Sequence, residues 1–482
     1  MTDSIRKSLR DSAAARWTAM AVVSFTMLCG YFVADVASPL KPLIEQQLHW
    51  NSAEYGLYTS AYGWFNVFLA MLVIGGIILD KMGPRFTGVL AAVLMLTGCT
   101  LNWWPMATAG WTGHLSLPVL GDTRTPVLIA ALGYALFGVG LEISGITATK
   151  VIAKWFKGYE MALAMGLQVA IARIGTGLAL GVSGTIATRF RVSTPVLVGV
   201  FLLGVGLVAY LFYCSMDRKL DASLPEATAE ASADEAFRLS DLGQILSNRG
   251  FWYIATLCAL FYSAVFPFLK YATDLMVQKF HVAESLAGLI PAMLPFGTML
   301  LTPVFGRVYD KKGKGATIML LGSGLIILVH VVLAVPFLDS WLVAVAAMLV
   351  LGVGFSLVPS AMWPSVPKLI PDRQLGTAYA LIFWLQNLIA LLLAPLIIGW
   401  LLDRFCITGK TVEMQSVEGV MQEVTVVHYD YTLPMVVFVG FGLCAAVFAL
   451  LLKAEDKKKG YGLELPNQPS APASDEQAAP AS

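Results

Sequence analysis

Charged residues are scarce in this sequence, and the short motifs of soluble enzymes are missing. Only 13% of the 482 residues are charged, against about 25% in a typical soluble domain. The formal net charge of +1 gives no indication of a nucleic-acid partner. Neither HExxH, GxSxG nor a P-loop occurs, so the sequence does not predict an enzyme. With so few charges, most of the molecular surface must lie out of water.

Patterns that would indicate a cofactor, a disulfide framework or a secreted domain are also missing. The six cysteines are scattered, without the spacing of a zinc site, and we expect them to be small core residues. No Asn-x-Ser/Thr sequence occurs, and no small-residue cleavage site follows the basic N-terminus. We therefore expect no bound cofactor, no glycosylated lumenal surface and no removable signal peptide.

Apolar residues are abundant instead. They make up 57% of the chain, and they recur in runs of about 20 residues, the length that crosses roughly 30 Å of hydrocarbon. The sequence predicts an all-α membrane protein with twelve transmembrane helices in a lipid bilayer. The predicted spans are residues 17–38, 57–79, 86–104, 126–149, 161–188, 194–214, 251–277, 287–308, 316–337, 341–362, 374–402 and 432–452.

The distribution of Lys and Arg predicts how the chain is oriented. With the N-terminus inside, the cytoplasmic segments hold 23 of the 32 basic residues and the outer loops hold 7, which places both termini in the cytoplasm. Polar composition predicts a linker and a disordered tail, and loop 403–431 could form a small hairpin. The predicted regions are a cytoplasmic N-terminus (1–16), a six-helix bundle (17–214), a cytoplasmic linker (215–250), a second six-helix bundle (251–452) and a tail (453–482).

One motif occurs twice. The second predicted span ends in GIILDKMGPR (76–85), and the eighth ends in GRVYDKKGKG (306–315). A single copy could be an ordinary basic loop, but two copies in register, 230 residues apart, indicate an internal repeat of six spans. The matched positions are Gly76, Asp80, Lys81 and Gly83 with Gly306, Asp310, Lys311 and Gly313; Arg85 follows the first copy.

In this motif the chain resembles the major facilitator superfamily, apart from Pro84, which stands where the motif usually has Arg. The resemblance implies two six-helix bundles related by a pseudo-two-fold axis, with a substrate site between them near mid-membrane. It also implies that the motif's aspartate, here Asp80, helps to close the cytoplasmic side against the N-terminal end of helix 11, where the helix dipole is positive. We expect Asp80, Lys81, Arg85, Asp310 and Lys311 to be gating or structural residues.

Six ionisable side chains lie inside the predicted spans, where a charge costs at least about 2.5–3.5 kcal/mol and needs a partner or a watery cavity. Five of them are on helices 1, 4, 5 and 7, which in the facilitator fold line or flank the cavity. The six are Asp35, Glu142, Arg173, Lys270, Asp274 and His330. Their placement predicts a polar cavity between the bundles.

Two interpretations are open for Glu142 and Arg173. They could form a buried salt bridge, or each could bind one end of a zwitterionic substrate, the carboxylate taking an ammonium and the guanidinium a carboxylate. Asp35 has a predicted structural or gating role, and His330 is expected to be a packing residue. Lys270 and Asp274, four residues apart, are predicted to form a local ion pair.

Aromatic and amide side chains near these charges are candidates for contacts with a peptide backbone. Such a residue alone is more often a packing or interfacial residue than a ligand contact, but together they offer donors and flat walls to a peptide. The candidates are Tyr62, Asn66, Tyr262, Trp363, Gln386 and Asn387.

Longer blocks resemble the lysosomal dipeptide transporter family of the facilitator superfamily. They are GVGLEISGITATKVIAKWFKGYEMALAMGLQVAIARIG, YSAVFPF and WPSVPKLIPDRQLGTAYALIFWLQN, in which Ala380 replaces the family's glycine. The resemblance implies transport of dipeptides by alternating access as a uniporter, with Glu142 and Arg173 at the substrate's two ends. A facilitator of another small zwitterion or organic anion, with or without proton coupling, is the alternative.

Two departures from that family modify the expectation. No acidic dileucine-type sorting stretch precedes the first span, so a bacterial inner membrane is expected rather than a lysosome, and an accessory subunit has no support. The ExxER pattern of proton-coupled peptide transporters is replaced by CGYFVADVASP, which argues against proton coupling.

Overall fold

The computed structural model describes residues 11–108, 110, 111, 113–117, 121–156, 159–223, 242–371, 374–417 and 420–466. The described chain is mostly helical, as predicted, because an isolated apolar segment in a bilayer can satisfy its backbone hydrogen bonds only as a helix. Parts of the predicted N-terminus, linker and tail (residues 1–10, 224–241 and 467–482) lie outside the described residues, and the domain boundaries stay predictions.

The N-terminal half contains the first six predicted spans. Helix 1 continues beyond its predicted end as a 3-10 turn and a short helix, so that one apolar segment runs from Ala13 to Leu48. The elements are α1 (Ala13–Asp35), α2 (Lys41–Leu48), α3 (Ser52–Ser60), α4 (Trp64–Phe68), α5 (Met71–Ala107), α6 (Thr125–Trp155), α7 (Met161–Arg189) and α8 (Thr194–Ser223).

The structure has eleven helices long and apolar enough to cross a membrane among its described residues, one fewer than predicted. The reason lies in helix 2, which is broken into α3, a 3-10 turn, α4 and the start of α5, with Ala70 in the left-handed region at φ 48°. Its last part is merged with helix 3 in α5, although the backbone turns at Gly83. When α5 is divided at the turn at Gly83, so that helices 2 and 3 are counted separately, the described chain has the twelve predicted spans.

The C-terminal half repeats the arrangement, and two of its helices are interrupted at mid-length. Helix 7 breaks at Ala264–Val265, so that Pro267 is the second residue of the helix that follows, and helix 11 contains a π-helical stretch at Asn387–Leu393. The elements are α9 (Leu242–Ser247), α10 (Arg249–Ser263), α11 (Phe266–Gln278), α12 (Glu284–Ala287), α13 (Leu289–Lys312), α14 (Gly315–Ala334), α15 (Trp341–Leu369), α16 (Leu375–Gln386), α17 (Ala394–Phe405) and α18 (Thr432–Lys459).

The two copies of the repeated motif have the same local backbone. Gly83 and Gly313 both have positive φ, 75° and 65°, a conformation that glycine adopts without steric cost. Each ends its helix and reverses the chain into the next span. Glycine is therefore the residue that fits the turn at both positions.

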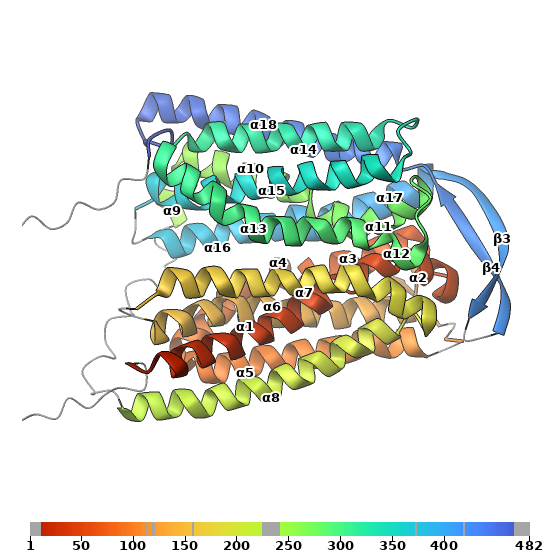
Figure 1. Cartoon of the computed structure of the whole chain (residues 1–482), viewed down its shortest axis with the longest axis horizontal. Helices are drawn as coiled ribbons and strands as arrows, with labels where there is room; N and C mark the ends of the chain where they lie inside the picture. Colours follow the sequence, from red (N-terminus) through yellow and green to blue (C-terminus); the bar gives the residue numbers. More distant parts are fainter. Residues whose placement is uncertain are drawn as a thin grey trace, which may run out of the picture.

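The two halves lie side by side, with both described ends of the chain on one face (Figure 1). We call it the terminal face. The opposite face, the hairpin face, carries β1 (His114–Leu117) paired with β2 (Gly121–Arg124), and β3 (Ile407–Val417) paired with β4 (Val420–Tyr429). The second hairpin confirms the one predicted within 403–431; the first was not predicted.

Candidate functional site

A cavity of about 380 Å³ lies between the two halves. Its walls come from helices 1, 2, 4 and 5 of the first half and helices 7, 8, 10 and 11 of the second. None of the described residues that line it belongs to helices 3, 6, 9 or 12. The distribution is the one predicted from the positions of the intramembrane charges.

Glu142 lines this cavity from the middle of α6. Its Oε1 accepts a hydrogen bond of 3.0 Å from the hydroxyl of Tyr62, in the 3-10 turn that interrupts helix 2. The carboxylate is half-buried, and no basic side chain among the described residues lies within ion-pairing distance of it. Tyr62 therefore fixes the direction of the carboxylate and leaves it an acceptor for a cationic group.

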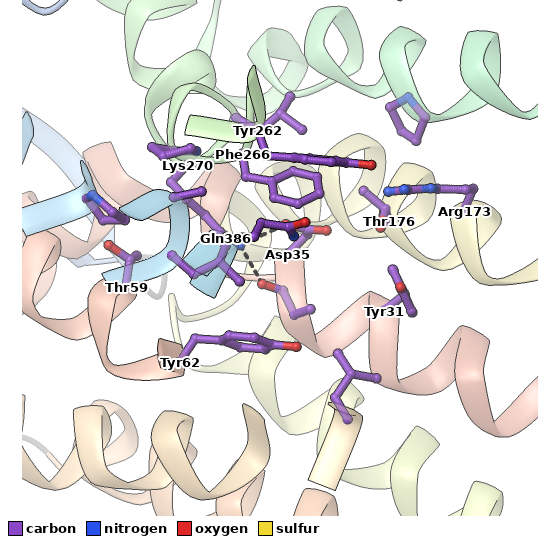
Figure 2. Close-up of a pocket in the computed structure, with 18 of the residues that line it drawn as sticks. Tyr31, Asp35, Thr59, Tyr62, Arg173, Thr176, Tyr262, Phe266, Lys270 and Gln386 are labelled. Atoms are coloured by element: carbon purple, nitrogen blue, oxygen red, sulfur yellow. Dashed lines mark hydrogen bonds and ion pairs between the residues drawn. The ribbon is translucent and has the colours of Figure 1, made fainter. Parts of the chain in front are cut away.

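Arg173 lines the same cavity from α7, and its side chain points into the cavity beside Thr176 (Figure 2). No acidic side chain of the described chain lies within ion-pairing distance of its guanidinium. Instead, its Cζ lies 5.8 Å from the ring centroid of Tyr31 and 5.7 Å from that of Phe355. The salt-bridge interpretation of Glu142 and Arg173 is therefore wrong for this conformation: the two opposite charges share a cavity and do not pair.

Four of the six predicted aromatic and amide contacts line the cavity. Tyr62 and Tyr262 lie on opposite sides of it (Figure 2), and Trp363 and Gln386 complete the wall of the second half. Trp363 stacks on Phe383 at a centroid distance of 5.0 Å. These rings give the C-terminal half a largely aromatic surface toward the cavity.

Asn66 and Asn387 do not line the cavity, contrary to the prediction of substrate contacts. Each donates its amide to the carbonyl four residues earlier in the chain, Asn66 to Tyr62 O at 3.1 Å and Asn387 to Phe383 O at 2.9 Å. Both carbonyls belong to interrupted helices, where local hydrogen bonding by a short amide competes with substrate contact.

The predicted ion pair between Lys270 and Asp274 is wrong. Lys270 Nζ lies 2.7 Å from Asp35 Oδ1 of the other half and also donates to Ala34 O at 2.6 Å. Dashed lines in Figure 2 mark this contact at the edge of the cavity. Asp274 instead accepts from Lys41 at 2.5 Å. Both charges reach across the boundary between the halves, which local spacing could not reveal.

Lys41 and Glu45 do not line the cavity but belong to the contacts between the halves, and sequence reasoning missed them. Lys41 Nζ lies 2.8 Å from Glu45 Oε1, and its side chain is fully buried. Tyr431 also donates to Asp274, and Tyr429 donates to Glu45 at 3.3 Å. The sequence placed these residues in an outer loop. The i,i+4 spacing of Lys41 and Glu45 in KPLIEQQL was the available signal that the helix resumes there.

These contacts close the cavity toward the hairpin face. Among the described residues, hydrogen bonds and ion pairs between the halves lie at the depth of the cavity or nearer that face. Gly56 and Gly399 support the closure, because a Cβ on either would meet the other half's backbone at 2.7 Å or less. Beyond the cavity, toward the terminal face, the described parts of the two halves share no such polar contact.

On the terminal face, Asp80 pairs with Lys150 of α6 at 2.6 Å and not with helix 11. Arg85 pairs with Asp221 at 2.8 Å. Lys81, Asp310 and Lys311 are exposed, and their gating role stays a prediction.

Asp217, which sequence reasoning missed, is buried on this face. Both of its carboxylate oxygens lie 2.9 Å from Lys154 Nζ, and Trp155 and Tyr213 donate to it at 3.1 Å. Asp217 follows the predicted end of helix 6, so sequence reasoning had placed it in the linker.

His330 is fully buried between Phe268 and Phe438, as expected of a packing histidine. The described residues contain no group of three His, Cys, Asp or Glu side chains placed to hold a metal ion.

Comparison with known sequences gives a consistent pattern. The family model of the Major Facilitator Superfamily matches residues 23–395. The lysosomal dipeptide transporter MFSD1 of Mus musculus is 25% identical over 401 residues, 81% of each chain. The Danio rerio protein of that name is 27% identical over 369 residues, 74% of each chain. The hexuronate transporter of Escherichia coli K12 is 22% identical over 255 residues, 51% of this chain and 54% of its own.

Solved structures share the architecture. The nucleoside transporter NupG has a TM-score of 0.61 at 15% identity, covering 91% of this chain and 99% of its own. A bacterial homolog of the human lysosomal transporter Spinster, inward-facing and occupied, has a TM-score of 0.66 at 12% identity, covering 93% and 98%. At such identities the likeness concerns the fold alone.

Proposed function

The chain belongs to the major facilitator superfamily, and from that premise we propose that it is a secondary transporter that carries dipeptides across a membrane as a uniporter. One observation carries the proposal. Glu142 and Arg173 face one cavity with opposite charge, and neither has an ionic partner among the described residues. Because unpaired charges at this depth are costly, the ligand that fits this cavity has a positive end that pairs with Glu142 and a negative end that pairs with Arg173.

The chemistry of the two side chains assigns the ends of the substrate. Glu142, oriented by Tyr62, takes the terminal ammonium, and Arg173 takes the terminal carboxylate as a two-pronged donor. The substrate's side chains then face the rings of the C-terminal half, among them Tyr262, Phe266 and Trp363. Recognition of both termini with few directional contacts elsewhere favours a broad range of dipeptides.

Alternating access follows from where the halves touch. The conformation described here is closed toward the hairpin face, and transport requires these contacts to break while the terminal side closes. With the termini in the cytoplasm, as the distribution of Lys and Arg predicts, the side that is closed in this conformation is the outer one. A bacterial inner membrane is the proposed location.

A facilitator of an organic anion is the second candidate, because Arg173 alone could bind a carboxylate. The matching hexuronate transporter covers only about half of this chain, which gives this candidate weaker support. A proton-coupled mechanism would add Glu142 as the titrating group. The two candidates differ in whether the substrate needs an ammonium group.

The experiment is counterflow in proteoliposomes loaded with an unlabelled dipeptide, with radiolabelled dipeptide and unlabelled competitors outside. Free dipeptides should compete, whereas hexuronate and other monocarboxylates should not, and net uptake into unloaded proteoliposomes should not require a pH gradient. Competition by monocarboxylates but not by dipeptides would reject the proposal, and dependence on a pH gradient would reject uniport.

Two variants test the assignment of ends. Glu142→Gln should lose its preference for a free over an N-acetylated dipeptide, and Arg173→Ala its preference for a free over a C-amidated one. Asn387→Ala, close to the cavity but not lining it, is the matched control and should keep both preferences. If both variants lose transport of N-acetylated and C-amidated dipeptides to the same extent, Glu142 and Arg173 have a structural role and do not bind the two ends of the substrate.

A further inference from the structure

The guanidinium of Arg173 lies between two aromatic rings that belong to different halves of the protein. Tyr31 is on α1 of the same half, and Phe355 is on α15 of the other. The distances from Cζ to the ring centroids are 5.8 Å and 5.7 Å, within the range of a cation–π interaction. Since no acidic side chain of the described chain lies within ion-pairing distance, these two rings are the contacts of the guanidinium that the structure shows.

Phe355 is held rigidly by other rings of its own half. Its plane is within 2° of that of Phe261 at 5.9 Å, and it meets Tyr262 and Phe266 edge-on at 5.7 and 5.9 Å. Its side chain is 3% exposed. Tyr262 and Phe266 flank the break in helix 7 at Ala264–Val265. Arg173 of the first half therefore rests against the part of the second half where helix 7 is interrupted.

We propose that Phe355 is a positioning residue for Arg173, through which the C-terminal half sets the affinity for the substrate's terminal carboxylate. A ring makes no hydrogen bond to the N–H groups of a guanidinium that it attracts, so the ring favours this position of the guanidinium without competing with the carboxylate for those N–H groups. The inference rests on the proposed function, because it assigns to Arg173 the carboxylate end of the substrate.

The arrangement also links recognition to the contact between the halves. Arg173 and Phe355 lie at the depth of the cavity, and any movement that separates the halves there removes the ring from the guanidinium. Carboxylate binding is therefore strongest in conformations that keep Phe355 beside Arg173. A ring that served only for packing would affect all ligands alike.

The test compares a free dipeptide with its C-amidated form. Phe355→Leu removes the ring and keeps a bulky apolar side chain, whereas Phe355→Tyr keeps the ring. In proteoliposomes, Phe355→Leu should raise the KM for the free dipeptide roughly 3- to 10-fold, and leave the inhibition constant of the C-amidated dipeptide within about 2-fold. Phe355→Tyr should retain near wild-type values for both.

Phe261→Leu is the matched control, because Phe261 packs on Phe355 in the same cluster but does not contact Arg173. Phe261→Leu should lower the unfolding temperature in detergent about as much as Phe355→Leu does. It should change the affinities for the free and the C-amidated dipeptide by the same factor. In an Arg173→Ala background, Phe355→Leu should have no further effect on the preference for the free carboxylate.

The outcomes separate this inference from the function on which it rests. If Phe355→Leu weakens free and amidated dipeptides equally while Arg173→Ala still removes their difference, Phe355 is only a packing residue and the inference is overturned. If Arg173→Ala itself leaves the preference for the free carboxylate intact, the proposed function fails.

Discussion

Lys270 and Asp35 form an ion pair of 2.7 Å across the boundary between the two halves, at the edge of the cavity. Further toward the hairpin face, Asp274 and Lys41 form a second one with the signs reversed. Helix 7 thus presents a positive and then a negative charge, and the segment containing helix 1 presents a negative and then a positive one. These two ion pairs, Lys270–Asp35 as the first rung and Asp274–Lys41 as the second, join the halves on the hairpin side of the cavity.

Exchanging the charges of the first rung tests this role. Asp35→Asn or Lys270→Met removes one partner and leaves a partly buried charge uncompensated, so each should slow dipeptide counterflow by about 10-fold or more. The exchange Asp35→Lys with Lys270→Asp should recover a substantial part of the rate. An exchanged protein as slow as the single variants, although equally stable in detergent, would contradict the assignment of this pair to the gate.

The pairing of these charges marks the limit of what the sequence could predict. The spans and the repeat follow from local hydrophobicity and from the spacing of the two motif copies, and the cavity-facing helices from the resemblance to the facilitator superfamily. The partner of Lys270, in contrast, comes from a segment 235 residues away, and local spacing favoured Asp274 instead. Pairing between the halves depends on how the halves pack, and the periodicity of apolar residues along the sequence does not reveal this packing.

The candidate site divides in the same way. Glu142 and Arg173 were found because a charge in an apolar segment needs an explanation. Tyr31 and Phe355 were missed, because an aromatic residue in a membrane helix is ordinarily a packing residue. Asn66 and Asn387 were predicted as ligand contacts, but both amides bond to their own chain.

Asp80 offers a prediction for the terminal face. Its carboxylate pairs with Lys150 here, and when the terminal side closes it should move to the positive N-terminal end of helix 11. Asp80→Asn weakens that contact, so transport should slow while expression and thermal stability stay unchanged. Lys219→Gln, an exposed residue near the end of α8 that has no predicted gating role, is the control and should transport normally. Unchanged turnover in Asp80→Asn would remove the gating role.

Asp217 should be a stability residue without a role in substrate affinity. Its carboxylate is 1% exposed and receives hydrogen bonds from Lys154, Trp155 and Tyr213. Asp217→Asn replaces a buried carboxylate that accepts from three donors by a neutral amide, and Lys154 keeps only the exposed Asp221 as an ionic partner among the described residues. We expect a loss of roughly 3 kcal/mol in unfolding free energy. The KM for dipeptide should not change.

Asp221→Asn is the comparison for this prediction, because Asp221 contacts Lys154 and Arg85 but is 42% exposed. It should cost less than about 1 kcal/mol. Thermal unfolding in detergent measures both variants. Equal stability of the two would show that burial does not decide the strength of this cluster.

The last described segment, residues 460–466, should stabilise the second copy of the repeated motif. Glu464 accepts from Thr317 N at 3.0 Å and from Thr317 Oγ1 at 2.8 Å, and so caps the beginning of α14. Backbone bonds join Lys314 to Glu464 and Gly315 to Leu463. The first copy, with Asp80, has no such cover among the described residues.

Ending the chain after Lys459 removes this cap and the fully buried side chain of Leu463. We expect a lower unfolding temperature in detergent, and an effect of about 1 kcal/mol for Glu464→Gln alone, since a neutral amide is a weaker partner for a helix N-terminus. A chain ending after Pro466 is the control and should match the full chain. Because the segment contacts only the C-terminal half in the described structure, dipeptide affinity should persist in the shortened protein; a selective loss of affinity at unchanged stability would give the segment a part in transport instead.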